Sequence, residues 1–388
     1  MKKFGYYEFF AGGGMARLGL GDHWNTLLAN DFDPHKADAY ASNFRPRGEL
    51  VVADVNNLST ADLPKGGLMA WASFPCQDLS LAGNGKGLHA SRSGCYWPFW
   101  RIMKDKVSQG VPVPILAIEN VVGLLHANKG RDFARLLRSL HELGYSYGAM
   151  VVDAVHFVPQ SRPRLFIVAA RPEIVTYSGI ASDAPIKPWH TERLVETVGS
   201  LDKDLLDNWV WWEMPKPNPR KVQLNHLILK EPGTVEWHDK TQTDKLLSLM
   251  SPLHRRKVED ATRYGKRVIG TIYKRTRPDE MGRKSQRAEV RFDGIAGCLR
   301  TPAGGSSRQT IIVVEGRKIR TRLLDPREAA RLMGVPEWYK LPKNYNDAYH
   351  LMGDGLAVPA VAWVEEHVLR PLAKAAVAKP INVSEAVA

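Results

Sequence analysis

Seven short apolar runs occur in the first 170 residues, and each has the length of a buried β-strand. They cover residues 6–10, 26–29, 50–52, 68–71, 115–118, 149–152 and 165–169. Between the fifth and sixth runs the apolar spacing becomes that of one helix face, and Gly144 stands where such a helix would end. That face is formed by Phe133, Leu136, Leu137, Leu140 and Leu143. Strands that alternate with helices predict an α/β fold with a doubly wound, mainly parallel sheet.

The alternation stops between residues 171 and 291, where prolines recur and tryptophans cluster at Trp209, Trp211 and Trp212. No strand–helix repeat is recognisable in this stretch, which is typical of loops and irregular structure. The sequence therefore predicts a smaller, irregular second domain after the α/β part.

A regular pattern resumes at Asp325. Asp325, Pro326 and Glu328 have the order of an N-cap, a first-turn proline and a capping-box glutamate. The helix that they open is expected to stop at Gly334, and capping is the structural explanation of Glu328. A further helix is expected from Val358 to about residue 376, followed by a loose tail.

The charge balance indicates the kind of partner. The 388-residue chain carries a formal net charge of +13, which favours a polyanionic partner, with nucleic acid ahead of an anionic membrane. Residues 252–291 alone hold 13 Lys and Arg against five Asp and Glu. Tyrosines and glycines interrupt this run, so we expect irregular loops that enter a nucleic-acid groove rather than a solvated helix face. No stretch approaches the roughly 18 apolar residues that a membrane span needs.

The three cysteines, Cys76, Cys95 and Cys298, form no Cys-x-x-Cys pair and leave an odd count. This usage argues against a disulfide framework and against a cysteine-based zinc site. It favours a reducing cytoplasm, and no metal site is expected.

A glycine-rich loop at residues 10–14 follows the first predicted strand and precedes a helix. Glycines there let a ligand approach the backbone beside helix N–H groups that favour negative charge. Asp31 or Asp33 follows the second strand, about 20 residues on, where a ribose hydroxyl is usually held, and Asp54 follows the third. Arg17 occupies the place of the last glycine in the dinucleotide fingerprint, so the loop favours a nucleoside-type ligand over a dinucleotide.

Reactive side chains adjoin three other predicted strands. Cys76 follows the strand at 68–71, Glu119 follows the strand at 115–118, and Arg162 and Arg164 stand at the start of the last strand. Each has an ordinary explanation when taken alone. Cys76 could be a buried structural cysteine, Glu119 a surface or capping carboxylate, and the two arginines surface charge. Together, near the edge where open α/β sheets place their chemistry, they indicate a thiol nucleophile, a proton-holding carboxyl group and guanidinium groups for a carbonyl oxygen or phosphate.

In these features the chain resembles the DNA (cytosine-5)-methyltransferases of bacterial restriction–modification systems. The matching motifs come in the family's order and span nearly the whole chain outside residues 171–291. They are Phe10-Ala11-Gly12-Gly13-Gly14, Asn30-Asp31, Asp54, Pro75-Cys76-Gln77, Glu119-Asn120-Val121, Gln160-Ser161-Arg162-Pro163-Arg164, Arg327-Glu328-Ala329-Ala330-Arg331-Leu332-Met333-Gly334 and Gly353-Asp354-Gly355-Leu356-Ala357-Val358-Pro359. The full ordered set is much more specific than any of its members.

The resemblance implies a Rossmann-like methyltransferase fold that depends on S-adenosyl-L-methionine. It implies a catalytic and cofactor-binding domain at residues 1–171, a target-recognition domain at 172–343, and a C-terminal segment at 344–388 that returns to the catalytic domain. The residues expected to bind the cofactor are Phe10, Gly12, Gly14, Asp31, Asp54, Pro75 and Asp354.

The implied reaction methylates carbon 5 of a cytosine that is flipped out of a short, specific duplex DNA sequence. Cys76 is expected to add to carbon 6, Glu119 to bind N3 and the exocyclic amine, and Arg164 to hold the O2 carbonyl. Arg162 is expected to orient the catalytic loop, and the stretch 83–87 to close over the base. Further substrate contacts are expected from Gln77, Ser80, Asn120 and Gln160.

Two positions depart from the family's usual pattern. Asp31 is one methylene shorter than the common glutamate, which makes Asp33 a candidate to share ribose binding. Gly353-Asp354-Gly355 stands where Gly-Asn-Ser is frequent. Neither departure removes a catalytic group.

Three alternative functions stay open. A tRNA cytosine-5 methyltransferase carries the same motifs, although the long basic insertion favours duplex DNA. A catalytically idle DNA-binding regulator would not need the intact set of Cys76, Glu119 and Arg164. A dinucleotide oxidoreductase is disfavoured by Arg17.

The expected partners are double-stranded DNA and a cognate restriction endonuclease that acts on the same sequence. The expected state is a monomer without membrane association, in the bacterial cytoplasm and bound to nucleoid DNA.

Overall fold

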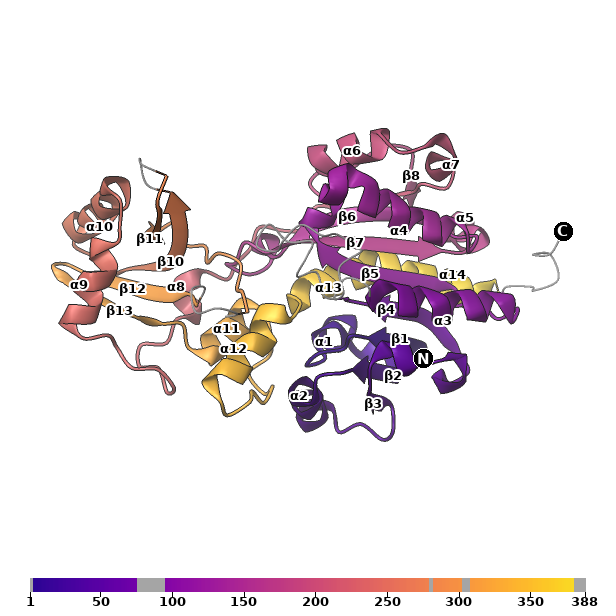
Figure 1. The fold of residues 1–388 in the computed structure, drawn as a ribbon, viewed down its shortest axis with the longest axis horizontal. Helices are drawn as coiled ribbons and strands as arrows, with labels where there is room; N and C mark the ends of the chain where they lie inside the picture. The colour runs from indigo at the N-terminus through magenta and orange to yellow at the C-terminus, as the bar shows by residue number, and fades with distance from the viewer. Residues whose placement is uncertain (1–2, 75–94, 279–281, 302–307, 380–388) are drawn as a thin grey trace. The chain divides into compact units, whose positions relative to one another are not determined.

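The fold is shown in Figure 1 as a computed structural model that describes residues 3–74, 95–278, 282–301 and 308–379. The chain divides into two compact units. Unit 1 comprises Met1–Asp153, Pro163–Pro217 and Ala360–Ala388, and unit 2 comprises Ala154–Arg162 and Asn218–Pro359. These bounds differ from those of the three functional parts expected from the sequence, whose roles stay predictions.

Unit 1 is built on a seven-stranded sheet with the order β3-β2-β1-β4-β5-β7-β6 (Figure 1). Its strands are β1 (Phe4–Phe9), β2 (Trp24–Asp31), β3 (Leu50–Val52), β4 (Gly67–Ala72), β5 (Ile115–Val121), β6 (Ser146–Asp153) and β7 (Pro163–Ala170). All seven apolar runs therefore form strands, as predicted. Neighbouring strands from β3 to β5 are parallel, whereas β7 is antiparallel to both β5 and β6.

Helices α3 (Tyr96–Ser108) and α4 (Arg131–His141) cover one face of this sheet. Their apolar side chains, such as Phe99 and Leu136, share one core cluster with strand residues that include Phe9. The predicted helix stripe thus belongs to α4, and Gly144 follows it with the left-handed φ of 74° that ends such a helix.

The C-terminal end of the chain covers the other face. α13 (Val358–Val364) continues through a π-helical turn, Glu365–Leu369, into α14 (Arg370–Ala378), so the helix expected from Val358 is confirmed. α14 packs against β4 and against α5 (Pro172–Ser178). With helices on both faces of a mainly parallel sheet, the doubly wound α/β fold is confirmed.

The remaining helices and strands of unit 1 are short. They are α1 (Met15–Leu20), α2 (Pro34–Phe44), α6 (Glu192–Gly199), α7 (Lys203–Leu206), β8 (Ala181–Ser182) and β9 (Trp211–Trp212). Within the described parts of both units, no helix is long and apolar enough to cross a membrane.

Unit 2 contains a four-stranded antiparallel sheet with the order β11-β10-β12-β13. The strands are β10 (Val268–Pro278), β11 (Lys284–Arg291), β12 (Thr310–Glu315) and β13 (Lys318–Leu323). Helices α9 (Lys240–Ser248) and α10 (Pro252–Tyr264) pack on one face around Leu246, Ile272 and Val290.

The basic stretch 252–291 was expected to form irregular loops, and this expectation is wrong. The stretch folds into α10 and the β10–β11 hairpin. The strand pattern is hidden in the sequence because only a few positions, such as Ile272, Ala288 and Val290, are buried and apolar, while charged and polar residues together occupy most of the others.

The predicted capping box opens α11 (Pro326–Leu332), which packs against α12 (Tyr345–Asp354). Asp325 Oδ1 accepts from the Arg327 amide at 2.8 Å, and the Asp325 amide donates to Glu328 Oε2 at 2.9 Å. The capping role of Glu328 is therefore confirmed.

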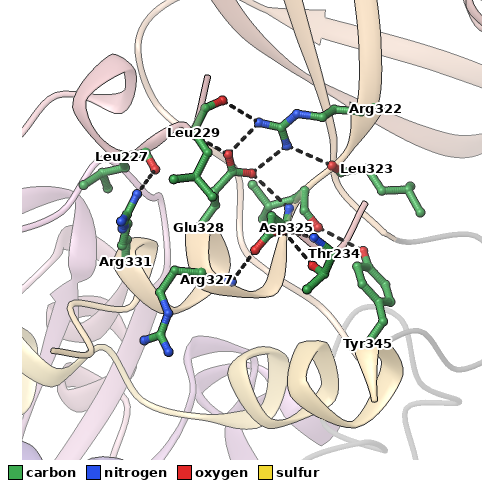
Figure 2. A network of polar contacts seen from close by, with 11 residues as sticks. Leu227, Leu229, Thr234, Arg322, Leu323, Asp325, Arg327, Glu328, Arg331 and Tyr345 are labelled. Atoms are coloured by element: carbon green, nitrogen blue, oxygen red, sulfur yellow. Dashed lines mark hydrogen bonds and ion pairs between the residues drawn. The ribbon is translucent and has the colours of Figure 1, made fainter. Parts of the chain in front are cut away.

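Glu328 also forms a buried ion pair that its capping position did not predict (Figure 2). Its Oε1 and Oε2 lie 2.6 and 2.8 Å from the Arg322 guanidinium nitrogens, and both side chains are 0% exposed. Glu328 Oε1 accepts from the Leu229 amide at 2.7 Å, and Arg322 donates to the Leu229 carbonyl at 3.1 Å.

A second contact at the same corner involves Asp325, whose Oδ2 accepts from the Thr234 hydroxyl at 2.6 Å. The corner between β13 and α11 therefore anchors the segment around Leu229, next to α8 (Leu224–Leu227).

Glu328→Ala should lower the free energy of unfolding by about 3–5 kcal/mol, because it leaves the Arg322 guanidinium buried without its counter-charge. Denaturant titration of the purified chain measures the change. Glu337→Ala is the matched control, since Glu337 pairs with Arg331 at 2.8 Å while its side chain is 63% exposed. The control should cost less than about 1 kcal/mol, and an equally small loss for both variants would contradict the stabilising role of the buried pair.

Candidate active site

The glycine-rich loop between β1 and α1 is held by an acidic side chain from β2. The Gly12 amide donates to Asp31 Oδ2 at 2.8 Å, and the Asp33 amide donates to Asp31 Oδ1 at 2.9 Å. Because β1 and β2 are parallel, their carboxyl ends meet at one edge of the sheet, where Gly12 and Asp31 come together.

Three residues of this loop, Phe10, Gly12 and Gly14, have left-handed φ values of 61°, 54° and 79°. The left-handed region is uncommon for a residue other than glycine, so Phe10 holds a strained backbone of the kind found at ligand sites. A Cβ atom at Gly12 would meet nothing within 4 Å, which shows open space beside the loop. A Cβ atom at Gly14 would lie 2.3 Å from the Phe44 ring, so Gly14 is required by packing against α2.

The acidic turn after β2 contains an exposed aromatic ring that the sequence analysis missed. Asp31 is buried, and desolvation raises the pKa of its carboxyl group, against the effect of the backbone N–H donors and Lys36. Phe32, directly after it, is 66% exposed. Its position next to Asp31, a predicted cofactor contact, was the available signal. Asp33 caps α2 by accepting from the His35 amide at 2.9 Å, so Asp31 is the acidic residue that contacts the loop.

Asp54 stands at the carboxyl end of β3 and caps a short 3-10 helix, Val55–Asn57. Its Oδ1 accepts from the Asn56 amide at 2.8 Å and from the Asn56 side chain at 2.9 Å. Both bonds use the same oxygen and fix the orientation of the carboxylate.

The reversed strand β7 brings Arg164 against Glu119. The β5–β7 register pairs Val121 with Arg164 and Glu119 with Phe166, which makes Glu119 and Arg164 diagonal neighbours on one face. Arg164 Nε lies 3.2 Å from Glu119 Oε1, and the side chains are 16% and 10% exposed, respectively. A largely buried carboxyl group and guanidinium group thus stand side by side at the carboxyl end of β5.

The predicted residues Pro75, Cys76, Gln77 and Ser80 lie outside the described residues, as does the stretch 83–87 expected to close over the base. The strand that leads to them is described. Ala72, at the end of β4, pairs with Ile118 on β5, directly before Glu119. The chain therefore enters the cysteine-containing segment from a strand end beside Glu119.

Asn120 anchors the entry to that segment. Its Nδ2 donates to the Phe74 carbonyl at 3.3 Å, and its Oδ1 accepts from the Val121 amide at 2.9 Å. With 2% exposure, Asn120 has a positioning role in the structure, and its expected contact with substrate stays a prediction.

Arg162 precedes β7 and is buried within unit 2. It donates to the Leu299 carbonyl at 2.9 Å and to the carbonyl oxygens of Gly353 and Gly355, both at 2.7 Å. These bonds hold the Gly353-Asp354-Gly355 motif to the strand-like segment around Leu299. Residues two apart within a strand point the same way, but this rule does not apply to Arg162 and Arg164, because β7 begins only at Pro163.

Two further predicted residues have internal partners in unit 2. Gln160 is fully buried, and it donates to the Leu332 carbonyl at 2.8 Å and accepts from the Leu299 amide at 3.1 Å. Asp354, at the end of α12, accepts from the Thr301 hydroxyl. These bonds describe structural roles, and the expected ligand contacts of both residues stay predictions.

A second buried carboxyl group, Glu8, lies on β1 just before the glycine-rich loop and was not selected from the sequence. Desolvation raises its pKa to about 8, although a hydrogen bond from the Tyr6 hydroxyl at 3.1 Å and the Arg17 charge act in the opposite direction. Arg17 in turn donates to the Tyr40 hydroxyl at 2.7 Å. This buried network connects β1, α1 and α2 behind the loop.

A family model for C-5 cytosine-specific DNA methylases matches residues 4–370. The chain belongs to this family. The resemblance drawn from the motifs is therefore confirmed, and so is the enzyme class, a DNA (cytosine-5)-methyltransferase.

Relatives of this methylase include type II methyltransferases. It is 26% identical to the type II methyltransferase M1.ScrFI of Lactococcus lactis subsp. cremoris, over 96% of this chain and 79% of that protein. It is 24% identical to the type II methyltransferase M.HhaI of Haemophilus parahaemolyticus, over 94% of this chain and 93% of that protein.

Solved structures support the fold of the methylase. The Dnmt2 methyltransferase of S. pombe matches with a TM-score of 0.58 and 15% identity, over 96% of this chain and 99% of that chain. The methyltransferase EhMeth of Entamoeba histolytica matches with a TM-score of 0.63 and 13% identity, over the same shares of the two chains.

Glu8→Gln should remove a pH dependence of the methylase's stability. The pKa of Glu8 is about 8 in the folded protein against an ordinary 4.5, so the folded chain keeps a proton that the unfolded chain releases between these values. The free energy of unfolding of the wild type should therefore fall, relative to that of Glu8→Gln, as the pH rises from 4.5 to 8, and level off above it. Denaturant titrations across this range measure the difference, and parallel pH curves for the two proteins would contradict a protonated Glu8.

Proposed function

We propose that this methylase transfers a methyl group from S-adenosyl-L-methionine to carbon 5 of a flipped-out cytosine in a short, specific duplex DNA sequence. The reaction proceeds through a covalent bond between Cys76 and carbon 6. The observation that carries the proposal is the Glu119–Arg164 pair, 3.2 Å apart, at the strand end beside which β4 leads toward Cys76. A carboxyl group next to a guanidinium group matches the N3, amine and O2 positions along one edge of cytosine.

The glycine-rich loop and its neighbours fit a nucleoside cofactor. Asp31 offers a carboxylate for the ribose hydroxyls, the exposed Phe32 ring offers a stacking surface for adenine, and the open space at Gly12 admits the rest of the molecule. Asp54 would accept a hydrogen bond from the adenine amine. When bound, S-adenosyl-L-methionine supplies an electrophilic methyl group on a positively charged sulfur. Phe10, Gly14, Pro75 and Asp354 remain predicted contacts of this cofactor.

Carbon 5 of cytosine is too weak a nucleophile to attack a methyl group unaided. Addition of the Cys76 thiolate forms a sulfur–carbon 6 bond and shifts the ring electrons toward carbon 5 and N3. Glu119 donates a proton to N3 as this charge develops, and Arg164 donates hydrogen bonds to O2. The ring then becomes an enamine with a nucleophilic carbon 5.

The remaining steps restore both the ring and the enzyme. The cofactor, held at Asp31 and Phe32, would supply the methyl group to carbon 5, with its methyl–sulfur bond breaking to leave a neutral thioether, and N3 would return its proton to Glu119. A general base removes the carbon 5 proton, the electron pair re-forms the double bond between carbons 5 and 6, and Cys76 leaves as a thiolate. Arg162 acts at a distance, by holding the 353–355 motif.

Duplex DNA is the proposed substrate. The target carbon is stacked inside the double helix, so the base must be flipped out to reach it, at a cost of a few kcal/mol. In this proposal residues 1–171 catalyse, residues 172–343 recognise the target, and residues 344–388 complete the cofactor site. A cognate restriction endonuclease, a monomeric state and a place on nucleoid DNA in the cytoplasm belong to the same proposal.

Base-resolution mapping of 5-methylcytosine, in DNA from a methylation-free host that expresses the chain, tests this function. The wild type should methylate cytosine in one short recurring sequence, and Cys76→Ala should leave the genome unmethylated. Glu119→Gln should slow methylation by about 100-fold or more, because it removes the proton donor at N3. Glu142→Gln, which changes an exposed carboxylate after α4, is the matched control and should have no effect.

Other results would contradict the proposal in distinct ways. Methylated tRNA beside unmethylated DNA would support the tRNA enzyme. Binding of cofactor and DNA without turnover, in folded wild-type protein, would support the idle regulator.

Phe32→Ala should weaken binding of S-adenosyl-L-methionine by about 5- to 100-fold, since stacking of a base on an aromatic ring contributes about 1–3 kcal/mol. Phe32 is 66% exposed, so its removal should leave the fold intact. Phe32→Trp keeps a stacking surface and should retain affinity. Isothermal titration calorimetry measures all three proteins, and unchanged affinity in Phe32→Ala would exclude the adenine contact.

A further inference from the structure

Strand β10 extends beyond the part of it that pairs with β12. It pairs with β12 only from Val268 to Ile272, whereas its pairing with β11 runs from Thr271 to Pro278. Residues 273–278 and 284–289 therefore form a two-stranded ribbon that extends beyond the third strand. An isolated two-stranded hairpin is at best marginally stable in water, so the protein gains little stability from this length.

The ribbon has a strongly basic composition. Its two strands, 273–278 and 284–289, hold five Lys and Arg and one acidic residue, Glu289. The apolar contact with α10 is made by Ala288 and Val290, near the base of the ribbon. Farther out, the cross-strand pair Thr276 and Gln286 is exposed. The outer part thus has no apolar face that would explain it as part of the core.

Two arginines face each other across the ribbon. The register places Arg275 directly opposite Arg287, and like charges in this arrangement destabilise a hairpin. Glu289 lies 3.3 Å from Arg275, whose side chain is 45% exposed, and offsets one of the two charges. No carboxylate in the described part of the chain forms an ion pair with Arg287. Among the residues that the structure describes, one positive charge therefore stays in excess at this position, where a polyanion would stabilise the ribbon.

We propose that this ribbon enters the major groove of the target DNA, and that Arg275 and Arg287 determine part of the recognised sequence. The inference rests on the proposed function. The major groove, about 12 Å wide, admits a two-stranded β-ribbon, and an arginine fork binds guanine O6 and N7 with two hydrogen bonds. Phosphates on either side of the groove supply the negative charge that the Arg275–Arg287 pair lacks. An RNA duplex fits less well, because its major groove is deep and narrow.

The basic residues of α10 behave as a solvated helix face. On α10, Arg263 pairs with Asp260 at 2.7 Å, and Arg255 donates to the Ser248 carbonyl at 3.0 Å. Arg256 and Lys257 lie on the exposed side of the same helix, which buries Val258 and Ala261. The two exposed cations provide a control with equal charge in the same unit.

The test starts from the sequence that the wild type methylates and measures methylation rates on purified duplexes with that sequence and with each single base-pair change. Arg275→Gln and Arg287→Gln should each lower the rate on the wild-type sequence by about 10- to 100-fold and relax the preference at one base pair. The double control Arg256→Gln with Lys257→Gln should keep both the rate and the preference. Thermal denaturation confirms that each variant is folded.

Arg275→Lys and Arg287→Lys distinguish base reading from charge alone, and they also serve if a glutamine variant does not fold. Lysine keeps the charge but loses the two-pronged hydrogen bond, so the relaxed preference should persist while the salt dependence of binding stays close to that of the wild type.

The outcomes separate this inference from the proposed function. A wild type that methylates no DNA would overturn the proposed function itself. A wild type that methylates one sequence, together with arginine variants that keep its rate and preference, would overturn the ribbon inference alone. Full restoration of the preference by the lysine variants would equally contradict base reading by these arginines.

Discussion

The reversed direction of β7 is the constraint on which the candidate active site depends. β7 begins at the edge where β5 ends, so Arg164, the second residue of β7, stands beside Glu119. A parallel β7 would begin at the opposite edge, roughly 20 Å away at about 3.3 Å per residue, and its first residues could not reach Glu119. Independently of this reversal, the parallel pairing of β4 with β5 ends β4 at the same edge. The one change of strand direction therefore brings together groups from two distant parts of the chain, Glu119 and Arg164.

The cofactor half of the site depends on simpler geometry, since the parallel strands β1, β2 and β3 end at one edge. Asp31 orders the glycine-rich loop through the Gly12 amide, and two of the three glycines of the loop have different roles. Gly12 leaves open space for a ligand, whereas Gly14 permits close packing on Phe44. Behind the loop, burial raises the pKa of Glu8 to about 8, so below that pH Glu8 adds little negative charge near the buried Asp31.

The sequence predicted the strands of unit 1 well, because a fully buried strand is a short apolar run whatever its neighbours are. It did not predict the direction of β7, since an apolar run has no direction. A signal for the reversed direction was present in the sequence. Only nine residues, 154–162, separate β6 from β7, and a parallel crossover needs a dozen or more. The β10–β11 hairpin was missed for a different reason: charged and polar side chains together outnumber the apolar ones, and few apolar ones are buried. Phe32 was missed because the feature that distinguishes it is the exposure of its ring, and the residue type alone does not reveal exposure. The capping box of Glu328 was recognised, whereas its buried bond to Arg322 joins two elements whose contact no local pattern reveals.

The central claim is that Cys76 bonds to carbon 6 of cytosine while Glu119 and Arg164 hold the ring. A duplex with 5-fluorocytosine at the methylated position tests it directly, because fluorine blocks the removal of a proton from carbon 5 and the covalent complex persists. With S-adenosyl-L-methionine present, mass spectrometry should show a protein–DNA adduct on the peptide that contains Cys76. The adduct should form more slowly with Glu119→Gln and be absent with Cys76→Ala. An adduct on another residue, or none from a wild type that methylates the ordinary duplex, would contradict the account.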